Sequence, residues 1–86
     1  IGAYLVNQAF VRRFEVFYWR ERDNEVDFIL RRKDSIVAIE VKSNAERRSE
    51  GLEKFRELFK PSSSFIVGDG GISPEEFMTM DLMKLF

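Results

Sequence analysis

The sequence predicts an α/β domain in which a mixed β-sheet is flanked by helices, with the elements in the order α-β-β-β-α-β. Three observations indicate this order: a helical spacing of apolar residues near the start, two strand patterns separated by a two-residue turn, and a second helical pattern followed by a short apolar run. The chain has 86 residues, which predicts a single domain over residues 1–86. A hydrophobic content of 44% is too high for a disordered chain.

The first half of the chain carries the first helix and three strands. Apolar residues from Leu5 to Phe14 recur at helical spacing and predict an amphipathic helix over residues 2–13. Dense β-branched and aromatic residues predict a strand over 16–19. Two further strands are predicted over 25–32 and 35–43, and the short connection between them predicts an antiparallel hairpin.

The second half predicts a helix, a short strand and a second, shorter helix. The first of these helices covers 50–59, with Ser49 as its N-cap and Pro61 after its end. A buried strand is expected over 65–67. Ser73, followed by Pro74 and Glu76, has the pattern of a capping box and predicts the short helix. The remaining tail is apolar enough to pack on the domain and leaves room for a homodimer.

Alternation along the two central strands assigns side chains to faces. In the strand over 35–43, one face carries Val37, Ile39 and Val41, which we expect to be buried, and the other carries Glu40 and Lys42. In the strand over 25–32, the two faces are expected to carry Val26, Phe28 and Leu30, and Glu25, Asp27 and Ile29. A hairpin would then bring Asp27 and Glu40 together on one side of the sheet, with Lys42 beside them.

Two neighbouring carboxylates repel each other unless a cation neutralises them. The chain has no Cys and no His, so a metal ion would have oxygen ligands, which points to Mg²⁺ or Mn²⁺. An ion held by Asp27 and Glu40 would acidify a bound water, and Lys42 would orient that water or stabilise charge on a phosphate. This is the chemistry of phosphodiester hydrolysis. The alternative is an ordinary solvated sheet face on which Asp27 pairs with Lys42.

Cationic residues on the first three strands are candidates for contacts with nucleic acid. Arg31, Arg32 and Lys33 are expected at a hairpin tip, and Arg20 follows two aromatic residues that could stack on bases. The alternatives are a solvated turn and aromatic side chains of the core. The net charge of −1 argues against binding of nucleic acid through overall charge alone.

The sequence also bears on location. No segment is long and apolar enough to cross a membrane, and no signal-peptide pattern opens the chain. Together with the absence of Cys, this predicts a cytoplasmic protein. Because the chain begins Ile1-Gly2 without Met, we expect it to be a fragment of a longer protein.

The stretches GAYLVN, FYWRERDNEVDFILRR, IVAIEVKS, GLEKF and EEF resemble the C-terminal nuclease-like domain, of unknown function, that is attached to prokaryotic AAA+ ATPases. The resemblance implies the PD-(D/E)XK, or restriction-endonuclease-like, fold, with Asp27 and Glu40 as metal ligands and Lys42 as catalytic lysine. It also implies an ATPase module before residue 1, and ATP would bind only there because this chain has no G-x-x-x-x-G-K motif.

One position departs from the pattern of this fold. Members often carry an acidic residue on the first helix, where this chain has Val6. Two hypotheses therefore remain. The first is a Mg²⁺- or Mn²⁺-dependent nuclease-like domain that acts on DNA or RNA. The second is a catalytically degenerate nuclease fold that serves its ATPase as a binding or assembly module.

Overall fold

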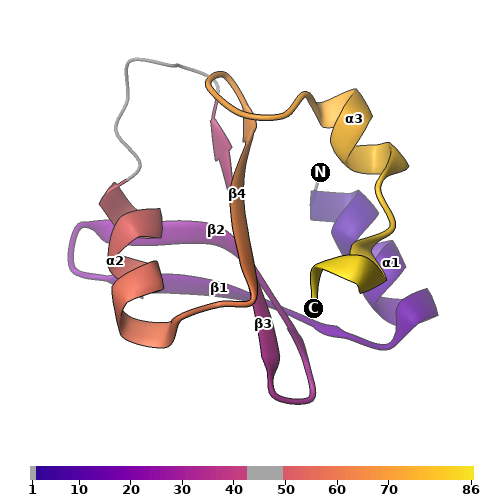
Figure 1. Cartoon of the computed structure of the whole chain (residues 1–86), viewed down its shortest axis with the longest axis horizontal. Coiled ribbons are helices and arrows are strands. Elements are labelled where there is room, and N and C mark those ends of the chain that lie inside the picture. The colour runs from indigo at the N-terminus through magenta and orange to yellow at the C-terminus, as the bar shows by residue number, and fades with distance from the viewer. Residues whose placement is uncertain (1, 43–49) are drawn as a thin grey trace.

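The computed structural model describes residues 2–42 and 50–86, and it has the predicted order of elements. These described residues form three helices and four strands, and the last element is a single turn of 3₁₀ helix (Figure 1). The strands at both ends of the sheet are longer than expected, because β1 extends to Glu21 and β4 begins at Ser63. The elements are α1 (Gly2–Arg12), β1 (Glu15–Glu21), β2 (Asn24–Arg32), β3 (Ser35–Lys42), α2 (Glu50–Phe59), β4 (Ser63–Gly68), α3 (Pro74–Thr79) and η1 (Leu82–Leu85).

The four strands form one mixed sheet in the order β1-β2-β3-β4. The first three strands are an antiparallel meander, and β4 pairs parallel to β3 after the chain passes through α2. The predicted hairpin between β2 and β3 is confirmed, with Arg32 opposite Ser35. The α/β class and the mixed sheet flanked by helices are therefore as the sequence predicts.

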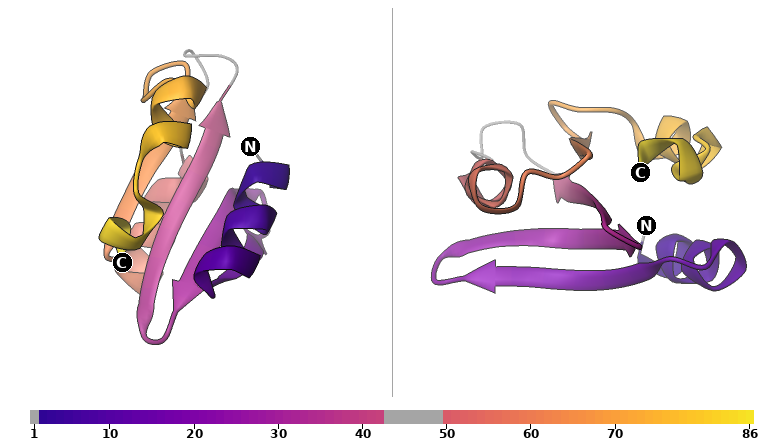
Figure 2. Two further views of the ribbon diagram at one scale, coloured as in Figure 1. Left: turned by 90° about the vertical axis from the view of Figure 1, so that its right-hand side faces the viewer. Right: turned by 60° about the horizontal axis from the view of Figure 1, so that its bottom comes forward.

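The helices lie on both faces of the sheet, so the protein has three layers (Figures 1 and 2). On one side α2 packs on the sheet, and on the other lie α1, α3 and η1. Each face has its own core cluster. The cluster under α2 is Val26, Ile29, Ala38, Leu52 and Phe55. The cluster on the other face is Leu5, Phe14, Leu30, Val37, Ile39, Val67, Phe77 and Leu82.

Helix α2 approaches the sheet closely at its first turn. Gly51, Leu52 and Phe55 are the buried residues of this helix. A Cβ atom on Gly51 would lie 2.0 Å from the backbone oxygen of Glu25. The absence of a side chain at position 51 therefore lets α2 rest directly on the backbone of β2. The expected N-cap Ser49 lies outside the described residues.

Both long helices end on a residue in the left-handed conformation. Arg13 has φ 61°, and the N–H of Phe14 donates to the carbonyl of Ala9 over 3.2 Å, which is the Schellman arrangement. Lys60 has φ 48°, and its N–H donates to the carbonyl of Arg56 over 3.0 Å. The capping of α3 is as predicted, since the hydroxyl oxygen of Ser73 accepts from the N–H of Glu76 over 3.1 Å.

The predicted alternation along β2 is wrong, because the pairing of β1 with β2 contains a bulge. Phe17 is opposite Ile29 but Trp19 is opposite Val26, so β2 has one extra residue between these pairs. Val26 consequently lies in the cluster under α2, whereas Leu30 lies in the cluster on the opposite face. The sequence placed these two residues on one face.

The predicted burial of Val41 is also wrong. Val37 and Ile39 are fully buried, but Val41 is 39% exposed. Val41 lies beyond Phe28 and Ile39, the last pair of the β2–β3 ladder, so β2 no longer flanks it there as a paired strand. Neither core cluster includes Val41.

Candidate functional site

Asp27 and Glu40 lie next to each other at one end of the β2–β3 pair. Phe28 is opposite Ile39 in the last pair of the β2–β3 ladder, and Asp27 and Glu40 are the next residues of the two strands. The Oδ2 atom of Asp27 accepts from the N–H of Val41, the residue after Glu40. Both predicted acidic residues therefore lie near the same end of the β2–β3 pair, where the amino end of β2 meets the carboxyl end of β3.

The carboxylate of Asp27 replaces a ladder hydrogen bond. Its Oδ2 atom accepts from the backbone N–H of Val41 over 2.8 Å. This bond holds the Asp27 side chain against β3, one residue away from Glu40, and compensates for the end of the regular pairing. Asp27 lies within the irregular stretch of β2 between Val26 and Ile29, and bulges commonly redirect side chains where pairing stops.

Glu40 has a buried carboxylate oxygen without a partner. The residue is half-buried, and its Oε2 atom is inaccessible and makes no hydrogen bond within residues 2–42 and 50–86. It lies two residues after Ala38, which packs under Leu52 and Phe55 of α2, so alternation puts Glu40 on the α2 side. A buried oxygen of a charged group without a partner costs free energy that a bound cation would offset.

Lys42 is the next residue on this face of β3. It is half-buried and lies opposite Gly68 in the parallel pairing of β3 with β4. Two residues along a strand span about 7 Å, so the long Lys42 side chain can reach the carboxylates from its own backbone position. All three predicted catalytic residues are therefore at the same corner of the sheet.

The acidic residues present fit a weakly held divalent cation. Among the described residues, no group of three Asp or Glu side chains could share an ion, and Val6 is an exposed residue on α1. Mg²⁺ is nevertheless commonly held by one or two carboxylates and completed by water and substrate phosphate oxygens. The unpartnered Oε2 of Glu40 and the carboxylate of Asp27, which is bonded to the N–H of Val41, would be this smaller set of ligands.

The predicted nucleic-acid contacts do not form one cluster. Arg31 is bound to Glu15 across the strands, with its Nε and Nη2 atoms 3.0 and 2.6 Å from the Glu15 Oε1 atom, and its guanidinium lies over the ring of Phe17. Arg32 and Lys33 are exposed beside it at the hairpin turn. Arg20 lies near the other end of β2, opposite Glu25. Arg31 is four residues from Asp27 along β2, which is about 13 Å.

A hydrogen bond between Tyr18 and Glu25, near the candidate site, was not predicted from the sequence. The Tyr18 hydroxyl donates to the Glu25 Oε2 atom over 2.5 Å. This bond raises the pKa of Tyr18 above its ordinary value of 10.0, with smaller contributions from burial and from the Glu25 and Asp27 charges, and Arg20 opposes them. Tyr18 and Glu25 lie on the two strands that the β1–β2 turn joins. Predicting their hydrogen bond would have required the register of these two strands.

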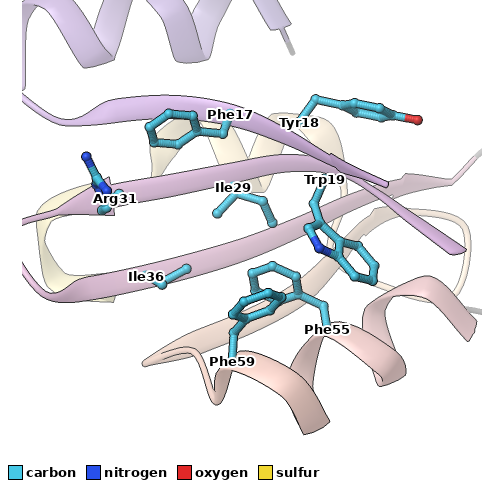
Figure 3. Close-up of a pocket in the computed structure, with 8 residues that line it drawn as sticks. All are labelled: Phe17, Tyr18, Trp19, Ile29, Arg31, Ile36, Phe55 and Phe59. Atoms are coloured by element: carbon cyan, nitrogen blue, oxygen red, sulfur yellow. The ribbon is translucent and has the colours of Figure 1, made fainter. Parts of the chain in front are cut away.

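An apolar hollow lies on the α2 face, towards the β1 edge of the sheet (Figure 3). Its volume is about 250 Å³. The Trp19 ring packs edge-on against Phe55 and Phe59, with centroids 5.3 and 6.1 Å away, so Trp19 belongs to the packing of α2 rather than to a free stacking platform. The hollow is lined by Phe17, Tyr18, Trp19, Ile29, Arg31, Ile36, Phe55 and Phe59.

Comparison with known proteins gives a family without an assigned activity. A family model described as a domain of unknown function (DUF4143) matches residues 1–80, which is nearly the whole chain. No curated protein matches the chain. Among residues 2–42 and 50–86, no helix has the length and apolar character needed to span a bilayer.

Proposed function

Since the chain belongs to the DUF4143 family, whose function is unknown, we propose its activity from the candidate site: a metal-dependent nuclease-like domain that acts on the phosphodiester bonds of nucleic acid. The observation that carries this proposal is the buried, unpartnered Oε2 atom of Glu40, with the Asp27 carboxylate bonded to the N–H of the next residue, Val41. A carboxylate in this position is stabilised by a cation, and the neighbouring lysine suits a phosphate substrate.

The order of elements supports the same proposal. The structure has α-β-β-β-α-β, with Asp27 on the second strand and Glu40 and Lys42 on the third. This arrangement agrees with the PD-(D/E)XK fold that the sequence resembles. Under that resemblance the domain would be joined to an N-terminal AAA+ ATPase module, where ATP would bind, and it would work in the cytoplasm.

In this proposal each residue has a separate task. Asp27 and Glu40 would hold Mg²⁺ or Mn²⁺, and the ion would supply Lewis-acid activation of the phosphate and of a water. The Lys42 ammonium group would donate a hydrogen bond to a phosphate oxygen and would orient the attacking water. The exposed cations Arg20, Arg32 and Lys33, and Arg31 if it exchanges Glu15 for phosphate, would contact the nucleic-acid backbone.

The test is a cleavage assay on plasmid DNA, single-stranded DNA and RNA with Mn²⁺ present. We expect Lys42→Ala to lower the rate by about 100-fold or more, because it removes a charged donor to the transition state. Lys84→Ala is the matched control: Lys84 is exposed on η1, and its loss should leave the rate unchanged. Failure of the folded wild type to cleave any of the three substrates would refute the proposal, as would full activity of Lys42→Ala.

A second function is supported by the surface of α1. Val6, Phe10 and Val11 are 59%, 89% and 68% exposed, which is unusual for apolar residues of one short helix. We therefore keep a second candidate, a degenerate nuclease fold that binds its ATPase module through α1, on its own or as a homodimer.

This second candidate makes a different prediction. Phe10→Ser should weaken association of the domain with the ATPase module of the same protein, measured by sedimentation, while Lys42→Ala should not. If Phe10→Ser leaves association unchanged, α1 is not the assembly surface.

A further inference from the structure

The turn that follows β4 packs against the backbone of Lys42. Lys42 and Gly68 are opposite each other in the parallel pairing, and the N–H of Asp69 donates to the Lys42 carbonyl over 3.1 Å. The turn is also bonded to itself, since the N–H of Gly68 donates to the carbonyl of Ile72 over 2.8 Å and that of Gly71 donates to Gly68 over 3.1 Å. In Figure 1 this turn lies at the end of β4, beside the end of β3.

Gly68 is the closest point of this contact. Its φ is 113°, and a Cβ atom at this position would lie 2.0 Å from the Lys42 carbonyl oxygen and 3.1 Å from the Lys42 carbonyl carbon. Non-bonded carbon and oxygen atoms do not approach to 2.0 Å, so any side chain at position 68 would displace the Lys42 backbone or the turn. The space that a side chain of residue 68 would fill is occupied by the backbone of Lys42.

Gly70 provides a natural comparison within the same turn. It also has a positive φ, of 80°, but a Cβ atom there would meet nothing within 4 Å. Substitution of either glycine by Ala therefore strains the backbone in the left-handed region. Only the substitution at Gly68 adds a collision with Lys42.

We propose that Gly68 is a positioning residue of the candidate site: by allowing the turn to close on Lys42, it fixes the direction in which the Lys42 side chain leaves β3 towards Glu40. Its catalytic consequence rests on the proposed function, but its effect on Lys42 does not. A displacement of about 1 Å in the group that bears a catalytic side chain can lower a rate by about 100-fold.

The experiment compares Gly68→Ala with Gly70→Ala. Both variants should lose stability in urea unfolding because of their positive φ. Only Gly68→Ala should change the ¹H and ¹³C chemical shifts of the Lys42 Cε group. In the Mn²⁺-dependent cleavage assay, Gly68→Ala should lower kcat by about 100-fold with little change in KM, and Gly70→Ala should keep the kcat of the wild type.

The outcomes separate this inference from the proposed function. If the wild type cleaves nothing, the proposed function fails, and the Lys42 chemical shifts still decide whether Gly68 positions the lysine. Unchanged Lys42 shifts in folded Gly68→Ala, or equal changes in Gly70→Ala, would overturn the inference. If Gly68→Ala does not fold, hydrogen exchange in the wild type decides: the Asp69 amide should be protected although Asp69 is exposed, and exchange at the rate of an open chain would refute the contact.

Discussion

Glu40 shows how a single residue can be badly placed for stability and well placed for chemistry. The β3 strand continues from the fully buried Ala38 and Ile39 into a carboxylate with an inaccessible oxygen. Substituting an apolar residue of similar size would remove the cost of burying that oxygen. Asp27, by comparison, has a structural use already, because it accepts a hydrogen bond from Val41. Of the two carboxylates, Glu40 is the one for which the fold alone offers no explanation.

The Tyr18–Glu25 hydrogen bond gives a test of the geometry beside Asp27. We expect Glu25→Ala to lower the pKa of Tyr18 towards 10.0, because both the hydrogen bond and the negative charge that favour the neutral phenol are lost. The pKa can be measured from phenolate absorbance in a Tyr4→Phe background, which leaves Tyr18 as the sole tyrosine. Glu21→Ala, a neighbouring exposed acid on β1, is the control and should change the pKa much less.

The sign of the pH dependence follows from the raised pKa. Because the folded state favours neutral Tyr18, the stabilising contribution is present below pH 10 and is lost as the pH rises above 10 through the folded pKa. In the Glu25→Ala variant this alkaline loss should disappear. A Tyr18 pKa that is the same in Glu25→Ala and in the wild type would mean that the two side chains are not bonded.

At the scale of secondary-structure elements, four turns depend on cationic residues in the left-handed region. Arg13 and Lys60 end the two long helices, and Arg22 and Lys33 lie in the two hairpins, with φ between 48° and 61°. Such a conformation costs a residue other than Gly roughly 1–2 kcal/mol. Glycine is the residue that usually indicates such a conformation, and none of these four positions is glycine. The sequence therefore did not predict the left-handed conformation of these residues.

Relief of this strain gives a stability prediction. Lys60→Gly should stabilise the domain by about 0.5–1 kcal/mol, since the gain at positive φ exceeds the added entropy of the unfolded chain. Lys60→Ala is the control, because it removes the same side chain while keeping a Cβ atom, and it should not stabilise. Urea unfolding measures both. Equal stability changes in the two variants would show that the side chain, and not φ, is responsible.

The docking of α2 gives the opposite prediction for a helical glycine. Ala normally favours a helix over Gly by about 1 kcal/mol, but at position 51 its methyl group would collide with the backbone of Glu25. We expect Gly51→Ala to destabilise the domain by about 2 kcal/mol or more. Gly2→Ala in α1 is the matched control, since its Cβ atom would make an ordinary 3.5 Å contact with the Phe28 ring. A stabilising Gly51→Ala would contradict the close approach of α2.

For the molecule as a whole, periodicity was enough to predict the order of the helices and strands. The hairpin between β2 and β3 follows from two strand patterns and a two-residue connection, and the structure pairs the strands from Arg32 opposite Ser35 to Phe28 opposite Ile39. The helix over 50–59 was predicted with the bounds that the structure has, because its apolar stripe is regular. These are local features, which a sequence carries directly.

Features that depend on contacts between distant elements could not be predicted. The bulge in β2 depends on how β1 pairs, and it moved Val26 to the α2 side. The exposure of Val41 depends on how far the core extends along β3. The ion pair between Arg31 and Glu15 depends on the β1 register, which sequence periodicity does not reveal. In each case the deciding partner is on another element.

The most direct test of the central claim is binding of Mn²⁺ to the isolated domain, measured by titration calorimetry. The claim is that Glu40 and Asp27 share a cation, so Glu40→Gln should weaken binding by at least about tenfold, which corresponds to about 1.4 kcal/mol. Glu57→Gln, an exposed residue on α2, removes the same charge elsewhere and should bind Mn²⁺ as the wild type does. Folded wild type that binds no Mn²⁺, or Glu40→Gln that binds it equally well, would contradict the assignment of a metal to these two carboxylates.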